Sequence, residues 1–315
     1  MTTSVALCTF NGEKFLKEQL DSILNQTVTI DEIIVCDDGS TDATISILNS
    51  YKEKFPEIFN IYINEENLRS VKNFEKAMLL CKNEIIFLSD QDDIWEKNKV
   101  EIILKNFNDY PNIDVISTSG FIINDESKIQ DKITIWDVPF FLQERQETLD
   151  FFYIINYWGN IATGATMGIR KKILPYLTPF PLAEGFHHDE WIALIASREN
   201  KYLHINNKLI YYRIHDQQQV GGICYDNKEK KRLVNYFSQA KKDFYFYKKF
   251  LKRISIIHKR NKSIFNINNP DIKKTQQILQ QDFVSIKTMM AKKYPIKSFF
   301  LFLFDKILNK RQINS

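Results

Sequence analysis

Cysteine is scarce in this sequence, with four residues among 315 and no CxxC pair. The four are widely scattered and mostly lie within apolar runs: Cys8, Cys36, Cys81 and Cys224. This usage argues against a disulfide framework and against a zinc site, both of which show clustered or paired cysteines. We therefore expect reduced thiols packed in the core of a cytosolic protein.

Long apolar runs are also missing. The longest, SFFLFLF at 298–304, is far shorter than the roughly 20 residues of a membrane-spanning helix. The first residues, MTTSVALCTFNGE, lack a basic segment followed by an apolar one, so we expect no export signal. These absences predict a cytoplasmic protein that is either soluble or bound to a membrane surface.

Charge is distributed unevenly, although the net charge is only +4. Residues 226–315 hold 22 Lys and Arg against 6 Asp and Glu, whereas residues 1–225 hold 21 against 33. The tail therefore carries +16 and the body −12. A basic tail predicts an anionic surface as its partner, and nucleic acid is a poor fit because the acidic body would repel phosphates.

Short β-branched runs alternate with amphipathic stretches from residue 3 to about 118. The runs predict strands at 4–10, 32–38, 59–64, 84–90 and 114–120. Between them, apolar residues at helical spacing predict a helix over 15–24 and another with Ser70 as its N-cap. Alternating elements with strands apolar on both faces predict an α/β, Rossmann-like fold with a doubly wound, mostly parallel sheet.

The chain divides into three parts. Residues 1–118 carry the alternating pattern, 119–225 are less regular, and 226–315 read as a basic helical extension with a break at 268–274. A hydrophobic content of 44% is enough for a sizeable core. We therefore expect one large domain in two halves with an appended tail.

Polar residues follow three of the predicted strands where each ends. Thr9, Phe10 and Asn11 follow the first, 37–40 the second and 90–93 the fourth. Ligands of such sheets bind beyond the carboxyl ends of the strands, so one crevice could collect all of these side chains. Capping of the next helix by Ser40 or Thr41 is the alternative, but it does not account for two consecutive aspartates.

The segment FLSDQDDIW at 87–95 crowds Asp90, Asp92 and Asp93 together. Like charges at this spacing raise each other's pKa, so such a cluster is usually offset by a cation. By itself the cluster indicates a divalent metal site or a solvated acidic turn about equally.

Three segments together resemble a known family. CTFNGEKFLKEQLDSILNQT, DEIIVCDDGSTDAT and EIIFLSDQDDIW are similar, in order and spacing, to the nucleotide-sugar domain of family 2 glycosyltransferases, which have the inverting GT-A fold. The similarity covers about residues 3–118 and extends more weakly to about 225.

The resemblance implies roles for the residues at the strand ends. Phe10 would lie beside the base of a nucleotide, flanked by Thr9 and Asn11, and Asp38 would accept a hydrogen bond from the base's imide N–H. Asp90 or Asp92 would contact the ribose. Asp92 and Asp93 would hold Mg²⁺ or Mn²⁺ against the diphosphate, because hard cations prefer carboxylate oxygens.

The resemblance also implies a catalytic base about one hundred residues after the metal motif, in an acidic motif that opens a helix. HHDEW at 187–191 fits this place, so we assign the base to Asp189, with Glu190 as the rival. Simple stabilisation of a helix N-terminus by two acids is the competing explanation.

Three segments together resemble the rhamnosyltransferase-like branch of the family, which builds bacterial surface polysaccharides such as O-antigen and capsule. They are TGATMGIRKKIL at 163–174, HHDEWIALIAS at 187–197 and YYRIHDQQQVGG at 211–222. His215 falls where some relatives supply an imidazole to the metal or the diphosphate, although it could equally be a packed loop residue. Acceptor-binding candidates are Trp158, Gly164, Ala165 and Thr166, with tight core packing as the alternative for the small residues.

Two departures from the family pattern matter. Arg69 stands where the family often has glycine, and its side chain could reach a phosphate. The QxxRW motif of processive members is absent, since 217–222 read QQQVGG, so we expect one sugar to be added per encounter.

The tail matches no known motif. Its lysines alternate with Phe237, Phe244, Tyr245, Phe246, Tyr247, Phe250 and Leu251. We favour an interfacial helix set at an anionic membrane over aromatics that pack on the catalytic domain.

Together these features predict a metal-dependent, inverting glycosyltransferase at the inner face of the cell membrane. It would move rhamnose from dTDP-rhamnose to a glycan acceptor linked to polyprenyl diphosphate, with a UDP-hexose or UDP-N-acetylhexosamine donor as the alternative. A nucleotidyltransferase is disfavoured, because CTFNGEKF has one glycine where a triphosphate loop needs several. An inactive membrane-bound scaffold is disfavoured, because the five aspartates of the motifs are present.

Overall fold

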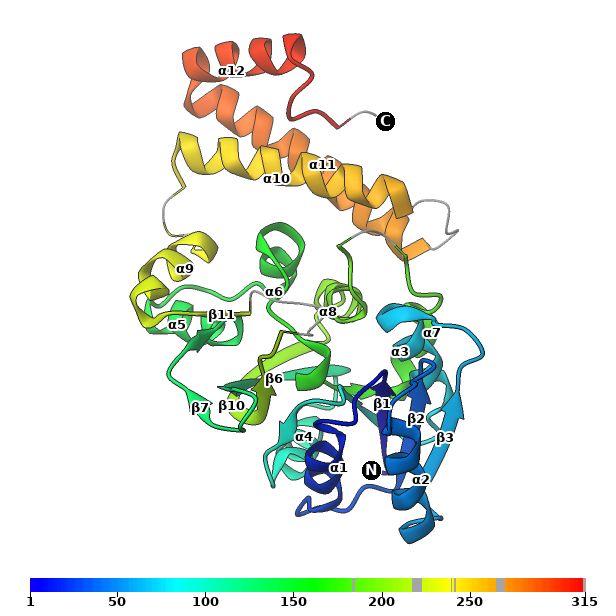
Figure 1. The fold of residues 1–315 in the computed structure, drawn as a ribbon. Coiled ribbons are helices and arrows are strands. Elements are labelled where there is room, and N and C mark those ends of the chain that lie inside the picture. The colour runs from blue at the N-terminus through cyan, green and yellow to red at the C-terminus, as the bar shows by residue number, and fades with distance from the viewer. Residues whose placement is uncertain (183–184, 217–222, 239, 241, 265–269, 314–315) are drawn as a thin grey trace.

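The apolar runs of the sequence form the strands of one large sheet in the computed structural model, which describes residues 1–182, 185–216, 223–238, 240, 242–264 and 270–313 (Figure 1). The strands are β1 Thr3–Thr9, β2 Glu32–Asp37, β3 Phe59–Ile63, β4 Ile85–Ser89, β5 Ile94–Trp95, β6 Val115–Ile123, β7 Ile129–Gln130, β8 Ile133–Thr134, β9 Gly168–Arg170, β10 Tyr202–Arg213 and β11 Cys224–Tyr225. All five predicted strands are confirmed, as β1, β2, β3, β4 and β6.

The helices lie between and after these strands. They are α1 Leu16–Leu24, α2 Thr44–Lys54, α3 Arg69–Leu80, α4 Lys99–Asp109, α5 Val138–Glu144, α6 Phe151–Tyr153, α7 Leu174–Leu177, α8 His188–Arg198, α9 Lys230–Phe237, α10 Phe244–Ile264, α11 Pro270–Lys293 and α12 Pro295–Ile307. The predicted helix over 15–24 is confirmed as α1.

The main sheet has the strand order β3-β2-β1-β4-β9-β6-β10-β5, with β7 paired to β6. Strands β1 to β4 are parallel to one another, and β10 is parallel to β6. The short strand β9 is antiparallel to both β4 and β6 and joins the two parallel sets. The sheet therefore runs without interruption past residue 118, where the two predicted halves meet.

Alternate residues of each strand supply two cores, one on each face of the sheet. In β1, Val5 and Leu7 pack with helices α1, α2 and α4, whereas Ala6 packs on the opposite face with α3 and α8. Because both faces are covered by helices, the strands are apolar throughout. The α/β, GT-A-like fold with a helical C-terminal extension is thus confirmed.

Helix α3 begins at Arg69 with Leu68 as its N-cap, two residues earlier than predicted, so the expectation that Ser70 is its N-cap is wrong. The N–H groups of Leu68 and Arg69 donate to the carboxylate of Asp38 instead, at 2.7 and 2.8 Å. A side chain from the end of β2 therefore satisfies the donors that a local N-cap would otherwise satisfy.

The tail helices α10, α11 and α12 form a layer above α8, with α12 farthest from the sheet (Figure 1). The predicted break between tail helices falls between α10 and α11, and residues 268–269 lie outside the described residues. The aromatic set proposed to face a membrane mostly packs inward: Phe237, Tyr247, Phe250 and Leu251 are buried, and only Tyr245 is strongly exposed. That assignment was wrong, because the apolar side of α10 covers the catalytic domain.

Within the described part of the chain, no helix combines the length and hydropathy needed to cross a membrane. The four cysteines are free thiols, and Cys36 and Cys81 are buried as expected. The segment 217–222, on which the expectation of single-sugar transfer rests, lies outside the described residues.

Candidate active site

The carboxyl ends of β1 and β2 are joined by buried hydrogen bonds. Asp37 accepts bonds from the Thr9 hydroxyl and the Ser40 hydroxyl, both at 2.6 Å. It also accepts the backbone N–H of Gly39, whose φ of +85° lies in the region that favours glycine. Thr9 and Asp37 therefore hold the turn that presents Asp38.

Asp38 is buried beside the loop that precedes α3. Besides the two N–H groups of α3, its carboxylate accepts a bond from Asn64 Nδ2 at 2.8 Å. Arg69 has a φ of +60°, so the chain keeps the left-handed conformation that the family's glycine would adopt. The Asp38 carboxylate therefore already stabilises the start of α3, and it would bind a nucleotide base in addition.

Phe10 is half exposed at the mouth of the crevice, where a nucleotide base could stack on it. Gln91 holds its backbone on both sides: Oε1 accepts the Phe10 N–H at 2.8 Å, and Nε2 donates to the Phe10 carbonyl at 2.9 Å. Gln91 also fills the space beside Gly12, where a Cβ would lie 2.3 Å from Oε1. Asn11 accepts the Thr41 N–H and so links the first two strand-end loops.

The three aspartates of the acid cluster have different surroundings. Asp92 Oδ2 lies 2.9 Å from Nε2 of His215, whereas Asp93 is 1% exposed and accepts the backbone N–H of Arg213. Burial, with Asp92 and Asp189 nearby, raises the pKa of Asp90 to about 7. The structure therefore brings Asp92 and His215 together, whereas Asp93 is buried with Oδ1 bonded to Arg213 and Oδ2 without a hydrogen-bond partner among the described residues.

Two buried basic side chains lie beside the cluster. Lys99 is fully buried, donates to the carbonyl of Ala165 at 2.6 Å and interacts electrostatically with Asp93 and Asp90. Arg213, also fully buried, donates to the carbonyl of Asp92 at 2.7 Å and to Glu18 at 2.6 Å. Burial lowers the pKa of Lys99 to about 7, so Lys99 offsets the charge of Asp90 and Asp93 only in part, and the guanidinium of Arg213 pairs with Glu18.

The family implies a divalent cation, and the donor set here fits one in part. A carboxylate oxygen of Asp92 and the imidazole of His215 are ligand types that Mn²⁺ accepts, and they converge. Among the described residues, no three His, Cys, Asp or Glu side chains are grouped for a metal. The protein would therefore supply two ligands, leaving the others to diphosphate and water.

Asp189 lies in the first turn of α8, as expected for a base in an acidic motif that opens a helix. Its carboxylate accepts bonds from the Glu190 N–H at 2.6 Å, Asn160 Nδ2 at 3.1 Å and the Gly164 N–H at 3.2 Å. Burial nevertheless raises the pKa of Asp189 to about 6. The Gly164 residue that donates to Asp189 packs against Leu88 of β4, so Asp189 lies beside the strand that Asp90 follows.

Glu190 points away from the crevice. Its Oε1 lies 2.8 Å from Nη1 of Arg260 on α10, and both side chains are largely buried. This ion pair joins the tail to α8, and it separates the two candidate bases, because Glu190 has a cationic partner whereas Asp189 accepts bonds from neutral donors.

The small residues Gly164, Ala165 and Thr166 form a buried 3₁₀ turn behind Asp189. A Cβ on Gly164 would lie 2.6 Å from Nε2 of His188, so the close approach at this glycine comes from His188. His188 stacks on Phe74, with ring centroids 4.1 Å apart. The side chain that packs against Gly164 is therefore His188, which supports core packing, the alternative considered for this glycine.

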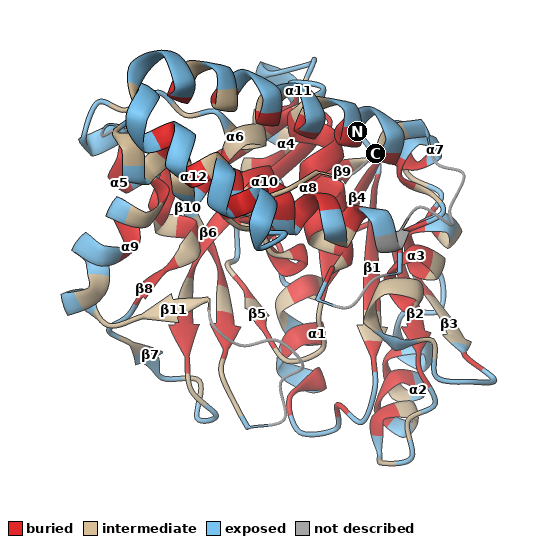
Figure 2. Ribbon diagram, turned by 90° about the horizontal axis from the view of Figure 1, so that it is seen from above, coloured by how far each residue is buried: buried red, intermediate tan, exposed pale blue. Residues whose placement is uncertain are grey.

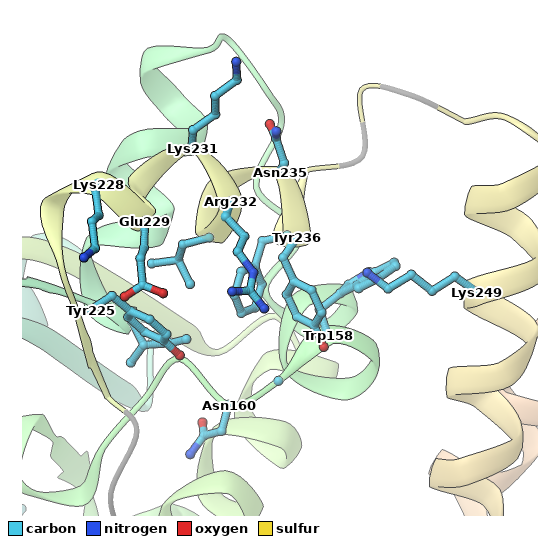
Figure 3. A pocket seen from close by; sticks show the side chains of 14 residues that line it. Trp158, Asn160, Tyr225, Lys228, Glu229, Lys231, Arg232, Asn235, Tyr236 and Lys249 are labelled. Carbon is cyan, nitrogen blue, oxygen red and sulfur yellow. The ribbon is translucent and has the colours of Figure 1, made fainter.

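Trp158 lines a cavity of about 1060 Å³ between α9, α10 and the loop that carries Asn160. Figure 3 shows Arg232 and Tyr236 side by side on its wall and Lys249 reaching from α10 toward Trp158. Lys249 Nζ lies 4.2 Å from the centroid of the Tyr236 ring. Because Asn160 donates to Asp189, the cavity ends beside the expected base.

Sequence reasoning missed Lys99, Asn160, Arg213 and Arg260, and it placed Gln91 only among the polar residues that follow β4, without a role of its own. Gln91 lies inside the acidic motif, so its position between two aspartates was an available signal. The other four are single polar residues in helices, strands or loops, and their spacing carries no sign of a tertiary partner.

Carboxylates at the carboxyl ends of β2 and β4, with a helix that opens with Asp189, are the arrangement of a GT-A-type enzyme. The profile of "Glycosyl transferase family 2" matches residues 4–176. The chain therefore belongs to glycosyl transferase family 2.

Several relatives support this assignment. The chain is 28% identical over 244 residues to the dTDP-rhamnosyl transferase RfbG of Shigella flexneri, covering 72% of this chain and 78% of that protein. It is 26% identical over 211 residues to a chondroitin synthase of Escherichia coli, covering 67% of this chain but 28% of that protein. The crystal structure of S. aureus TarS 1-349 in complex with UDP-GlcNAc has the same fold, with a TM-score of 0.54 and 17% identity over 96% of this chain and 76% of that one.

Proposed function

We propose that this glycosyltransferase is an inverting, metal-dependent enzyme that transfers one sugar per encounter. The observation that carries the proposal is that the Gly164 N–H holds Asp189 beside β4, the strand that Asp90 follows, whereas Glu190 is paired with Arg260. A single carboxylate then faces the place where donor and acceptor would meet. Inversion needs one base on the side opposite the leaving diphosphate.

In the proposed reaction, the acceptor hydroxyl oxygen attacks the anomeric carbon of the donor sugar. Asp189 takes the hydroxyl proton as the new C–O bond forms, and the bond from that carbon to the diphosphate breaks. The hydrogen bonds from Asn160 and Gly164 orient the Asp189 carboxylate. The products are the glycosylated acceptor, the nucleoside diphosphate and a protonated Asp189.

The nucleotide would lie over the ends of β1 and β2. Phe10 would stack on the base, Asp38 would accept its imide N–H with its remaining lone pairs, and Asp90 would bind the ribose. A divalent Mg²⁺ or Mn²⁺ held by Asp92 and His215 would stabilise the negative charge on the leaving diphosphate.

The donor we favour is dTDP-rhamnose, because the similarity to RfbG spans 72% of this chain and 78% of that transferase. A UDP-sugar remains the alternative, since the chain is also similar to a chondroitin synthase. The acceptor would enter through the cavity at Trp158, where Arg232 and Lys249 suit the anionic groups of a polyprenyl-diphosphate-linked glycan at the inner membrane face.

The experiment is to measure release of nucleoside diphosphate from dTDP-rhamnose, UDP-glucose and UDP-N-acetylglucosamine, each with Mn²⁺ or with EDTA. We expect release from dTDP-rhamnose that requires the metal. Release from a UDP-sugar instead would keep the enzyme class and change the donor, whereas no release from any donor, even with cell-membrane lipid extract as acceptor, would contradict the proposal.

A further inference from the structure

Helix α12 exposes one continuous apolar face. Its outward residues are between 43% and 73% exposed, although nearly all are large and apolar: Ile296, Phe299, Phe300, Leu303, Phe304, Ile307 and the following Leu308. At 100° per residue these positions fall on one side of the helix. A soluble protein seldom leaves such a face uncovered unless something binds it.

The opposite face of α12 is fixed to the protein. Leu301 is buried in the same core as Met290 of α11, and the Ser298 hydroxyl donates to the Met290 carbonyl at 2.8 Å. Figure 2, in which buried residues are red and exposed residues pale blue, shows α12 with its outer side exposed beside α10 and α11. Helix α12 is therefore already packed on α11 through its inner side, and the apolar residues on its outer side take no part in that packing.

The charges around α12 are almost all positive. Lys297 and Lys306 flank the apolar face on its two sides, and Lys292 and Lys293 precede the helix. The one carboxylate of the helix, Asp305, is buried and paired with Arg311. Phenylalanine in the centre and lysine along both edges is the pattern of a helix that lies in a membrane interface.

We propose that α12 is the membrane-docking surface of this enzyme, with its phenylalanine face inserted among the lipids and its lysines against anionic headgroups. A second copy of the chain suits this face poorly, because a symmetric pairing of two α12 helices would place the flanking lysines of each against those of the other. An anionic bilayer supplies both the apolar region and the negative charge.

Membrane docking through α12 adds to the proposed function, and it rests on that proposal only for the assumption that the acceptor is linked to a lipid. The tail layer lies directly over α8 (Figure 1), and the ion pair between Arg260 and Glu190 joins that layer to the catalytic helix. Docking through α12 would therefore hold the Asp189 end of the crevice near the bilayer that carries a lipid-linked acceptor.

The test is co-sedimentation of the full chain with vesicles of phosphatidylcholine, with or without about 30% phosphatidylglycerol. We expect binding to the anionic vesicles that weakens with added salt, and at least about tenfold weaker partitioning for the double variant Phe300→Glu, Ile307→Glu. The control is the double variant Leu79→Glu, Tyr110→Glu, which places the same two charges at comparably exposed apolar residues on α3 and after α4 and should bind as the wild type does.

Wild-type protein that stays in solution, or a double variant that binds as the wild type does, would overturn the proposal. So would a dimer in light scattering that the double variant abolishes, because the face would then join two copies. Release of nucleoside diphosphate without vesicles should be unchanged in the double variant. Wild-type protein that releases nucleoside diphosphate but does not bind vesicles would therefore disprove only the docking surface, and wild-type protein that binds vesicles without release would disprove only the proposed function.

Discussion

His215 Nε2 lies 2.9 Å from Asp92 Oδ2, across 123 positions of the sequence. Among the described residues, His215 is the histidine that contacts an aspartate of the acid cluster. The neighbouring Asp93 is buried, and its Oδ1 accepts the backbone N–H of Arg213. The two neighbours Asp92 and Asp93 therefore have separable roles, which gives the first prediction.

Asp92→Asn and His215→Ala should each weaken the Mn²⁺-dependent part of nucleoside diphosphate binding by about tenfold or more, because each removes a metal ligand. Asp93→Asn should instead change the thermal stability, since its carboxylate is buried next to Arg213 and Lys99. Calorimetric titration with Mn²⁺ and with EDTA, beside a thermal melt, measures both. Unchanged metal dependence in Asp92→Asn would refute the assignment.

The second prediction concerns pH. Burial raises the pKa of Asp189 to about 6, and a general base must be ionised to accept a proton. The turnover rate should therefore rise with pH below about 6 and level off above about 7. Because folding raises the pKa of Asp189 from 3.8 to about 6, its contribution to stability is fully present below about pH 4 and is lost as the pH rises from there through about 6. A rate that is flat across these values, measured with saturating donor and acceptor, would exclude Asp189 as the titrating base.

The third prediction concerns Gln91, whose amide holds both backbone groups of Phe10. Gln91→Glu keeps the acceptor but loses the donor, so it should weaken nucleotide binding by about three- to tenfold, and Gln91→Ala should do so at least as strongly. Gln277→Ala, at an exposed position of α11, is the control. Equal dissociation constants for Gln91→Ala and the wild type would show that Phe10 needs no such support.

The fourth prediction separates the backbone of Arg69 from its side chain. A left-handed φ of +60° costs an L-residue about 1–2 kcal/mol, so Arg69→Gly should raise the free energy of unfolding by about 1 kcal/mol. Arg69→Ala keeps that strain and removes only the guanidinium. If the side chain reaches a phosphate, both variants should lose nucleotide affinity, and if it does not, neither should. Urea unfolding and titration with nucleoside diphosphate measure the two effects, and a less stable Arg69→Gly would contradict the account of the backbone.

Much of the fold followed from the sequence because buried parallel strands leave a local signal. The five predicted strands begin and end within a few residues of the observed ones, and Asp189 was placed at a helix start by its motif alone. Tertiary partners leave no such signal. Lys99 resembles any lysine at the start of a surface helix, yet it is fully buried beside the acid cluster.

The tail shows the same limit. Aromatic residues alternating with lysines describe both a helix packed on a domain and a helix on a membrane, because periodicity does not say which face is covered. The aromatics of α10 pack inward, and the uncovered face belongs to α12, whose sequence drew notice only as too short to span a bilayer.

The most direct test of the catalytic account compares Asp189→Asn with the wild type, measuring transfer rate and nucleotide affinity in the same preparation. The account predicts a rate loss of about 10²–10⁴-fold with a nucleotide dissociation constant within about twofold of the wild type, because the variant loses proton acceptance and keeps the donor site. Glu190→Gln is the matched control, and it should lower the melting temperature while losing far less activity. Transfer by Asp189→Asn at the wild-type rate would contradict the central claim.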